Sequence, residues 1–231
     1  MRALITRPRF DAERSAEKLH ARGWHTLIDS VIEIETLAVP VPEGRYDAVV
    51  FTSANGVRAA TAFDAFRRIV VYAVGTRTAE VARECGFANV GIAAGDVNAL
   101  GDLIAAEMPA GARVLHLAGE DRAGDLPARL ARSGIHVETL VIYRARSALA
   151  LHAETIDGFR GGRIDAVLHY SERSAAIFVR LACAAGIDED IRKTRHLCLS
   201  AAVAAPLKLI GVAAEAAETP DETALFALLG D

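Results

Sequence analysis

Short apolar runs alternate along the whole chain with longer amphipathic stretches, and most of the runs end in hydroxyl or glycine residues. Residues 48–51 (AVVF) are followed by Thr52-Ser53, and residues 166–169 (AVLH) are followed by Tyr170-Ser171. A continuous apolar run of this length is typical of a parallel strand buried on both faces. The stretches that follow have helical spacing. The pattern therefore predicts an α/β protein with parallel sheets covered by helices.

The alternating pattern occurs twice. Residues 47–57 match residues 165–175 at an offset of 118, and residues 71–75 and 95–100 match 196–200 and 220–225 at an offset of 125. A further match is permuted in chain order, because residues 2–23 match residues 113–134 at an offset of 111. Such internal similarity indicates repeated structural units. The simplest arrangement is two similar domains, one inserted in the other.

The predicted elements divide between these two domains. In the first domain we expect strands at 3–6, 24–28, 166–169, 196–199 and 213–216, and helices at 12–22, 149–159, 174–185, 202–210 and 222–229. In the second we expect strands at 48–51, 70–74, 90–93, 114–117 and 137–141, and helices at 55–66, 78–85, 98–108 and 125–133.

The first crossing between the domains is expected just before Pro40, Pro42 and Gly44, which break the pattern. Residues 31–35 alternate between apolar and polar, as in a half-exposed strand. We therefore assign residues 1–35 and 146–231 to a discontinuous first domain and residues 38–141 to the inserted domain. The linkers are expected at about 31–37 and 140–146.

Composition narrows the function classes. The chain has 231 residues and a net charge of −4, which gives no basic field for nucleic acid or an acidic membrane. No apolar run approaches the roughly 20 residues of a membrane span, and the chain opens on a strand rather than a signal peptide. Cys85, Cys183 and Cys198 lie in apolar patterns that suit reduced core positions. We expect a cytoplasmic protein that binds neither nucleic acid nor membrane.

Candidate chemistry lies after the strands, because ligands of parallel α/β sheets bind beyond the carboxyl ends of the strands. Hydroxyls, glycines and guanidinium groups dominate there, and they include Arg7, Thr52, Ser53, Thr76, Thr78, Gly119, Arg122, Ser171 and Ser200. The sequence has no Gly-x-Ser-x-Gly, Walker or Gly-x-Gly-x-x-Gly motif and no His/Cys cluster typical of zinc. The residues predict a site that holds anions without metal or covalent chemistry.

Each candidate also has a purely structural interpretation. The serines and threonines could serve only as helix caps, and the arginines could be solvated loop charges. Tyr143 could be an ordinary interface aromatic. His116 and His169 lie within apolar strands, so we expect them to be core residues.

Several of these segments together resemble the uroporphyrinogen-III synthase family. The segments that carry the resemblance are 4–8 (LITRP), 47–57 (DAVVFTSANGV), 72–79 (YAVGTRTA), 117–122 (LAGEDR) with Leu126, and 141–143 (VIY). The resemblance implies two flavodoxin-like domains joined by a two-stranded linker. It also implies a lyase that needs no cofactor or metal and closes the linear tetrapyrrole hydroxymethylbilane into uroporphyrinogen III, with loss of water and inversion of ring D. Nothing in the sequence suggests a large exposed apolar face, so we expect a monomer.

The resemblance also implies roles for individual residues. Tyr143 matches a tyrosine proposed to assist departure of the leaving hydroxyl. Thr78 matches a threonine of the family's cleft, and Ser53 and Ser171 match its serines. We interpret these residues, with Arg7, Arg122 and nearby main-chain N–H groups, as ligands for the substrate's eight carboxylates.

One position departs from the family pattern. Where the family often has Gly-x-x-Thr after a strand of the C-terminal domain, this chain has residues 200–203 (SAAV), so Val203 supplies no hydroxyl. This departure keeps open a non-catalytic tetrapyrrole- or anion-binding protein on the same scaffold. A two-domain sugar- or amino-acid-binding protein is a third alternative, although such proteins usually carry a secretion signal when periplasmic.

Overall fold

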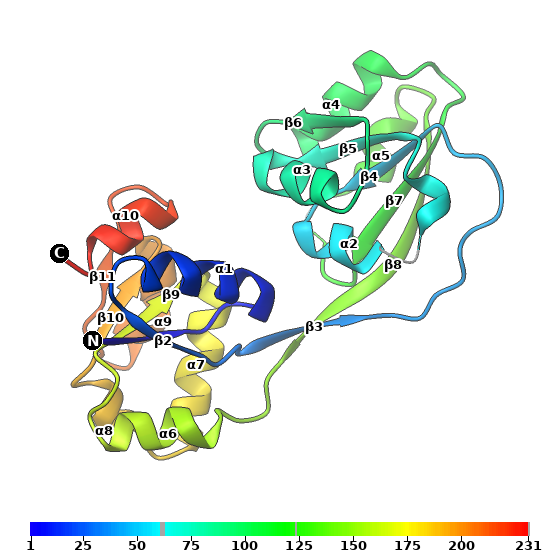
Figure 1. Ribbon diagram of the computed structural model, residues 1–231. Coiled ribbons are helices and arrows are strands. Elements are labelled where there is room, and N and C mark those ends of the chain that lie inside the picture. The colour runs from blue at the N-terminus through cyan, green and yellow to red at the C-terminus, as the bar shows by residue number, and fades with distance from the viewer. Residues whose placement is uncertain (61–62, 123, 231) are drawn as a thin grey trace. The chain divides into compact units, whose positions relative to one another are not determined.

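A computed structural model describes residues 1–60, 63–122 and 124–230, and the chain divides into two compact units (Figure 1). Unit 1 comprises Met1–Glu33 and Arg146–Asp231, and unit 2 comprises Ile34–Ala145. The chain passes between them through β3 (Ile32–Thr36) and β8 (His136–Ser147), which are neighbours in one sheet. The two strands are antiparallel, since hydrogen bonds join Leu37 to Ile142 and, further along, Ala148 back to Val31. The predicted two-stranded linker is confirmed.

Unit 1 contains a parallel five-stranded sheet in the order β11-β10-β9-β1-β2. Its strands are β1 (Arg2–Ile5), β2 (His25–Ile28), β9 (Ala166–His169), β10 (Arg195–Cys198) and β11 (Glu215–Ala216). Its helices are α1 (Arg9–His20), α6 (Ala153–Arg160), α7 (Glu172–Ala184), α8 (Asp188–Ile191), α9 (Ala201–Leu209) and α10 (Glu222–Ala227). Numbered within the unit, the strand order is 2-1-3-4-5, which is that of flavodoxin.

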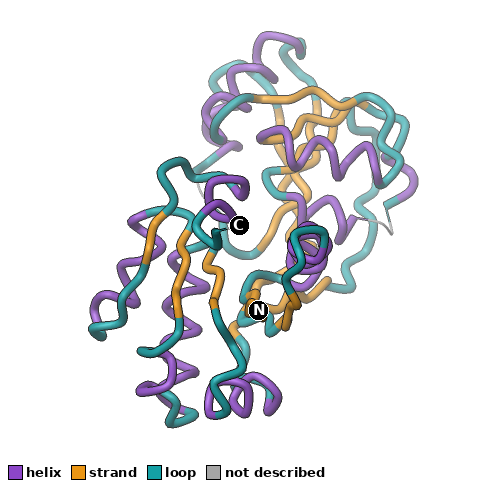
Figure 2. The backbone as a smooth tube through the Cα atoms, turned by 60° about the vertical axis from the view of Figure 1, so that its left-hand side comes forward, coloured by secondary structure: helices purple, strands orange, loops and turns teal. Residues whose placement is uncertain are grey.

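Unit 2 contains a six-stranded sheet in the order β3-β8-β7-β4-β5-β6, in which β4 to β8 are parallel. Its other strands are β4 (Ala48–Phe51), β5 (Val70–Val74), β6 (Val90–Ala93) and β7 (Arg113–Gly119). Its helices are α2 (Ala54–Ala59), a 3₁₀ helix (Asp64–Phe66), α3 (Gly75–Glu84), α4 (Val97–Glu107) and α5 (Leu126–Ala131). Helices cover both faces of each sheet (Figure 2).

The two sheets have the same spatial order once the chain order is permuted. Strands β2, β1, β9, β10 and β11 of unit 1 correspond to β8, β7, β4, β5 and β6 of unit 2. The registers agree as well: Ala3 pairs with Ala166, and Val114 pairs with Ala48, as the offsets of 111 and 118 require. The permuted repeat in the sequence therefore corresponds to two sheets built alike.

Alternation along the strands assigns each side chain to one of the two cores of its sheet. In unit 2, Val49 and Phe51 pack under α2 and α3, whereas Ala48 and Val50 pack under α4 and α5. In unit 1, α1 and α10 cover one face, where Leu19 and Phe226 meet the strands. Phe178 of α7 contacts the opposite face.

Several local predictions are wrong. The single helix expected at 55–66 is α2 and a 3₁₀ helix, and residues 61–62 between them lie outside the described residues. The short helix α8 was missed, because its run Asp188-Glu189-Asp190 has no helical apolar spacing. Cys198 is buried as expected, but Cys183 is exposed, because it lies on the outer face of α7. Across the described ranges, no helix has the length and apolar character needed to cross a membrane.

Candidate functional site

The ring of Tyr143 lies against two glycines of unit 2. A Cβ atom placed on Gly119 would lie 2.6 Å from Cζ and 2.8 Å from the hydroxyl oxygen of Tyr143. A Cβ atom placed on Gly56, in α2, would lie 3.4 Å from Cε1 of the same ring. Neither glycine has a positive φ. The ring excludes a side chain at Gly119, whereas at Gly56 the atom nearest to a Cβ would be the Leu117 carbonyl oxygen, at 3.1 Å. Gly119 therefore leaves the space in which the phenol lies.

An irregularity in the sheet brings Tyr143 to this position. The register of β7 and β8 shifts between Ala118 and Gly119, so that Gly119 pairs with Tyr143. The carbonyl oxygen of Tyr143 accepts a hydrogen bond of 3.0 Å from the Glu120 N–H. Such bulges redirect side chains at the ends of strands. Gly119, which we predicted as a substrate ligand, therefore also shapes the surroundings of Tyr143.

The predicted serines cap helices. Ser53, at the start of α2, accepts a hydrogen bond of 3.2 Å from the Asn55 N–H. Ser171 accepts one of 3.1 Å from the Ser174 N–H at the start of α7, and Ser200 accepts one from Val203 at the start of α9. Each serine thereby uses one acceptor position of its hydroxyl, and capping alone accounts for its position.

Two of the predicted threonines, Thr76 and Thr78, lie within α3, which begins earlier than expected. The helix starts at Gly75, whose φ of +73° favours glycine, and no described side chain caps its first N–H groups. Thr76 is exposed in the first turn, and Thr78 is buried. The open N-terminus of this ten-residue helix carries partial positive charge, which suits an anion.

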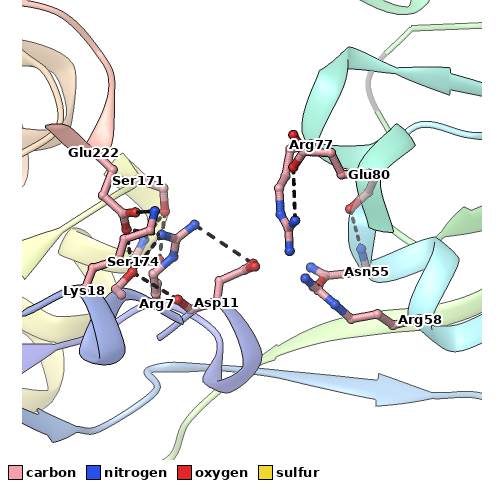
Figure 3. A network of polar contacts seen from close by, with 12 residues as sticks. Arg7, Asp11, Lys18, Asn55, Arg58, Arg77, Glu80, Ser171, Ser174 and Glu222 are labelled. Atoms are coloured by element: carbon pink, nitrogen blue, oxygen red, sulfur yellow. Dashed lines mark hydrogen bonds and ion pairs between the residues drawn. The ribbon is translucent and has the colours of Figure 1, made fainter. Parts of the chain in front are cut away.

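Arg7 follows β1 and is already engaged within unit 1 (Figure 3). Its guanidinium carbon lies 4.1 Å from the centroid of the Tyr170 ring, and Nη1 lies 3.2 Å from both Ser15 Oγ and Glu222 Oε1. Lys18 also contacts Glu222. Burial alone would raise the pKa of Glu222, but the bonds from Lys18 and Ser15 and the charge of Arg7 lower it overall. Arg7 is therefore only partly available to a ligand.

Arg122 lies beside a cavity of about 490 Å³ in unit 2. The lining residues are Val97, His116, Glu120, Arg122, Gly124, Asp125, Leu126, Pro127 and Thr139. His116 is buried as predicted, and its Nε2 lies 3.5 Å from the hydroxyl of Thr52, another predicted ligand. Burial first, and the charge of Arg122 second, lower the pKa of His116 to about 4.

Unit 1 contains a buried histidine pair. His196 Nε2 lies 2.9 Å from the Ile191 carbonyl oxygen and must donate to it, so His196 Nδ1 accepts from His169 Nε2 at 3.0 Å. Both rings pack against Phe178. Burial lowers the pKa of His196 to about 4, and burial with the neighbouring ring lowers that of His169. His169 is a core residue, as predicted.

Among residues 1–60, 63–122 and 124–230, no group of three His, Cys, Asp or Glu side chains is placed to hold a metal ion. The sequence did not predict Gly56 beside Tyr143 or Glu222 beside Arg7. Both contacts join residues far apart in the chain, and no short motif signals them. The cavity beside His116 was also missed, because its lining residues come from α4, β7, α5, β8 and the segment between β7 and α5, and meet only when unit 2 folds.

Comparisons with known proteins agree on one family. The family model for uroporphyrinogen-III synthase HemD matches residues 13–227. The structure is similar to uroporphyrinogen-III synthetase from Helicobacter pylori 26695, with a TM-score of 0.64, 17% identity, and coverage of 99% of this chain and 98% of that one. It is also similar to a mutant uroporphyrinogen III synthase from the extremely thermophilic bacterium Thermus thermophilus, with a TM-score of 0.51, 19% identity, and coverage of 99% and 96%.

Because these sequence identities are below 20%, the similarity to the solved structures supports the fold and not the activity. No curated protein matched the sequence. The family model, however, spans nearly the whole chain. The chain therefore belongs to the uroporphyrinogen-III synthase family.

Proposed function

We propose that this chain is a lyase that cyclises hydroxymethylbilane to uroporphyrinogen III, with loss of water and inversion of ring D. The observation that carries the proposal is the family match over residues 13–227. The geometry is compatible with such a substrate. Anion-binding groups lie at the carboxyl ends of the strands in each unit, and the substrate has eight carboxylates for them to hold.

The carboxylate ligands that we propose fall into three kinds. Main-chain N–H groups at the open start of α3 form the first. The second kind comprises the hydroxyls of Thr52, Ser53, Thr76, Thr78, Ser171 and Ser200, and the third comprises the guanidinium groups of Arg7 and Arg122, with Gly119 contributing main chain. Holding several carboxylates fixes the conformer of a flexible chain, which favours one ring closure over another.

Tyr143 is the proposed acid of the reaction. Its phenol gives a proton or hydrogen bond to the leaving hydroxyl, which departs as water and leaves a cation stabilised by the adjacent pyrrole. The cation bonds to the substituted carbon of ring D and gives a spiro intermediate. The bond between that carbon of ring D and its original bridging carbon then breaks, and the bridging carbon bonds instead to the unsubstituted α-carbon of ring D, which inverts the ring. Loss of the proton on this α-carbon restores the aromatic pyrrole. That proton balances the one taken from Tyr143.

Val203 is compatible with this activity. Its side chain is buried, and its N–H binds Ser200 Oγ at 3.4 Å. The hydroxyl that the family often places here is missing, so this end of unit 1 is left with Ser171, Ser200 and main-chain groups. We therefore propose weaker binding of one carboxylate rather than loss of catalysis.

We also propose that the chain works as a monomer in the cytoplasm, without nucleic-acid or membrane partners. The exposed large apolar side chains come from separate elements, with Leu149 and Leu209 the most exposed, at 96% and 87%. The net charge of −4 disfavours polyanionic partners. Sedimentation at several concentrations tests the oligomeric state, and a mass of twice the chain would contradict it.

The test of the main activity is a coupled assay in which hydroxymethylbilane is generated in the presence of the purified chain. The closed product is oxidised and its isomers are separated. Product that is mainly isomer III supports the proposal. Isomer I alone, as formed by spontaneous closure, would contradict it.

A further inference from the structure

The two sheets can be compared at the point where the strand order reverses, the usual ligand site of open α/β sheets. In unit 1 this point lies between β1 and β9, and in unit 2 it lies between β7 and β4. The registers of the two pairs are equivalent, so the residues around the two points correspond one to one.

In unit 1 this position is filled by side chains. Arg7 stacks on Tyr170 and binds Ser15 and Glu222. The ring of Tyr170 packs against the core formed with α1 and α10. The charged groups of this cluster pair with one another, whereas the buried Tyr170 hydroxyl has no hydrogen-bond partner among the described residues.

In unit 2 the equivalent position is hollow. The repeat places Thr52 at the position of Tyr170, Val97 at that of Glu222 and Leu126 at that of Ser15. Helix α1 begins at Arg9, but α5 begins only at Leu126, six residues after the corresponding Glu120. The shorter helix and the smaller side chains of Thr52 and Val97 coincide with the cavity of about 490 Å³.

The deep part of this cavity has unused hydrogen-bonding capacity. His116 is 4% exposed, and it lies opposite Thr139 in the pairing of β7 with β8. His116 Nδ1 and Thr139 Oγ1 are both buried, and neither has a hydrogen-bond partner among the described residues. Buried polar groups of this kind normally have partners, so the pair indicates a ligand or ordered water.

The charges indicate which ligand fits. If the Thr52 hydroxyl gives its proton to His116 Nε2 instead of to a carboxylate, Nδ1 carries the ring proton and is the donor that has no partner. Arg122 lowers the pKa of His116, so a positive potential reaches the imidazole. The carboxylates of Glu120 and Asp125 also line the cavity, but both residues are exposed, and Asp125 accepts the Ala128 N–H at 3.0 Å. Arg122 is exposed as well, so one guanidinium and two carboxylates lie at the rim, whereas His116 Nδ1 and Thr139 Oγ1 are the buried polar atoms.

We propose that this cavity is a carboxylate pocket that takes one acetate or propionate arm of the substrate, with His116, Thr139 and Arg122 as donors. The proposal rests on the proposed function for the identity of the ligand. It assigns binding roles to His116 and Thr139 that no sequence motif suggested. It also makes the two units unequal, because the matching position in unit 1 is closed by its own side chains.

Imidazole ¹⁵N NMR of the full chain tests the pocket directly, with propionate as the probe and propionamide as its uncharged control. We expect propionate to shift the His116 resonances and raise the pKa of His116, since an anion stabilises imidazolium. We expect Thr139→Val to weaken propionate binding roughly fivefold to tenfold, as for one lost hydrogen bond to a charged group. Thr194→Val removes a hydroxyl bound to the Asp190 carbonyl in unit 1 and should leave binding unchanged.

The proposed carboxylate pocket would be refuted if propionate and propionamide gave equal responses. It would also be refuted if Thr139→Val bound propionate as well as the wild type does. Either result would stand even if the chain makes isomer III. Conversely, a propionate response in a chain that makes no isomer III would support the pocket as a carboxylate site and refute only the proposed function. In an active chain, Thr139→Val should raise KM with kcat nearly unchanged, because it removes a contact that binds the substrate and the transition state equally strongly.

Discussion

The ring of Tyr143 occupies the space that a side chain at Gly119 would fill. A Cβ atom on Gly119 would lie 2.6 Å from Cζ and 2.9 Å from Cε2 of that ring, closer than real Cβ contacts. The two residues are paired across β7 and β8 at the register shift. The position of the phenol is therefore coupled to the absence of a side chain far earlier in the sequence.

Gly119→Ala should displace the phenol while keeping the fold. Crowding of this kind typically costs about 1–3 kcal/mol of folding free energy. If the position of the Tyr143 hydroxyl matters, kcat falls by more than this destabilisation explains. Gly91→Ala is the matched control, because it crowds the ring of Tyr72 at 3.1 Å in the same unit. Equal kcat in the two variants would remove the link between Gly119 and catalysis.

Tyr143→Phe removes the proposed acid and little else. General acid catalysis typically contributes about 10²–10⁴-fold, so kcat should fall within that range while KM changes little. Tyr72→Phe is the control, because it removes a hydroxyl that binds Glu107 at 2.9 Å on the opposite face of the sheet. Full turnover by Tyr143→Phe would exclude the phenol from the mechanism.

The buried histidines predict loss of stability in mild acid. Their folded-state pKa values lie below the unfolded value of about 6.5, at about 4 for His196 and His116. Their neutral forms therefore stabilise the fold fully above about pH 6.5, and this contribution is lost as the pH falls toward 4. Each contributes roughly 2 kcal/mol less at pH 5 than at pH 7.

Urea unfolding at pH 7 and pH 5 measures this loss. His196→Gln keeps a donor for the Ile191 carbonyl but does not titrate, so the difference between the two pH values should shrink. An exposed histidine, His25, provides the control, since His25→Gln should leave the pH dependence as it is. Unfolding free energies that are equal at both pH values in the wild type would contradict burial of the neutral rings.

Glu222→Gln tests the cluster that fills unit 1. The change leaves Arg7 stacked on Tyr170 without its nearer carboxylate partner, with Asp11 still 4.0 Å from Nη2, and Glu222 has only 21% of its side chain exposed. We expect a loss of about 1–2 kcal/mol in unfolding free energy, between the values for exposed and buried pairs. Glu154→Gln, at the more exposed pair with Arg2, should cost less than about 1 kcal/mol. Equal losses would show that the cluster adds nothing.

The sequence predicted the sheets well for a physical reason. Strands such as residues 48–51 and 166–169 are buried on both faces, so they appear as continuous apolar runs. The permuted match of residues 2–23 with 113–134 then implied the insertion, and the identical registers bear it out.

What could not be predicted depends on side chains that meet only after folding. From the sequence, Arg7 was predicted to be an exposed ligand, but in the folded chain Glu222 lies beside it and pairs with it. Thr78 was a candidate cap at the start of a helix, but α3 begins about one turn earlier, at Gly75, which has a positive φ. The substrate roles proposed for these residues rest on the family resemblance.

The isomer composition of the closed product shows whether the chain directs ring closure of a linear tetrapyrrole. Hydroxymethylbilane is supplied at a fixed rate, and the fraction of isomer III is followed as the protein concentration increases. We expect isomer III to rise until it replaces isomer I almost completely, and Tyr143→Phe to need far more protein to reach the same fraction. A product that remains isomer I at every protein concentration would contradict this expectation.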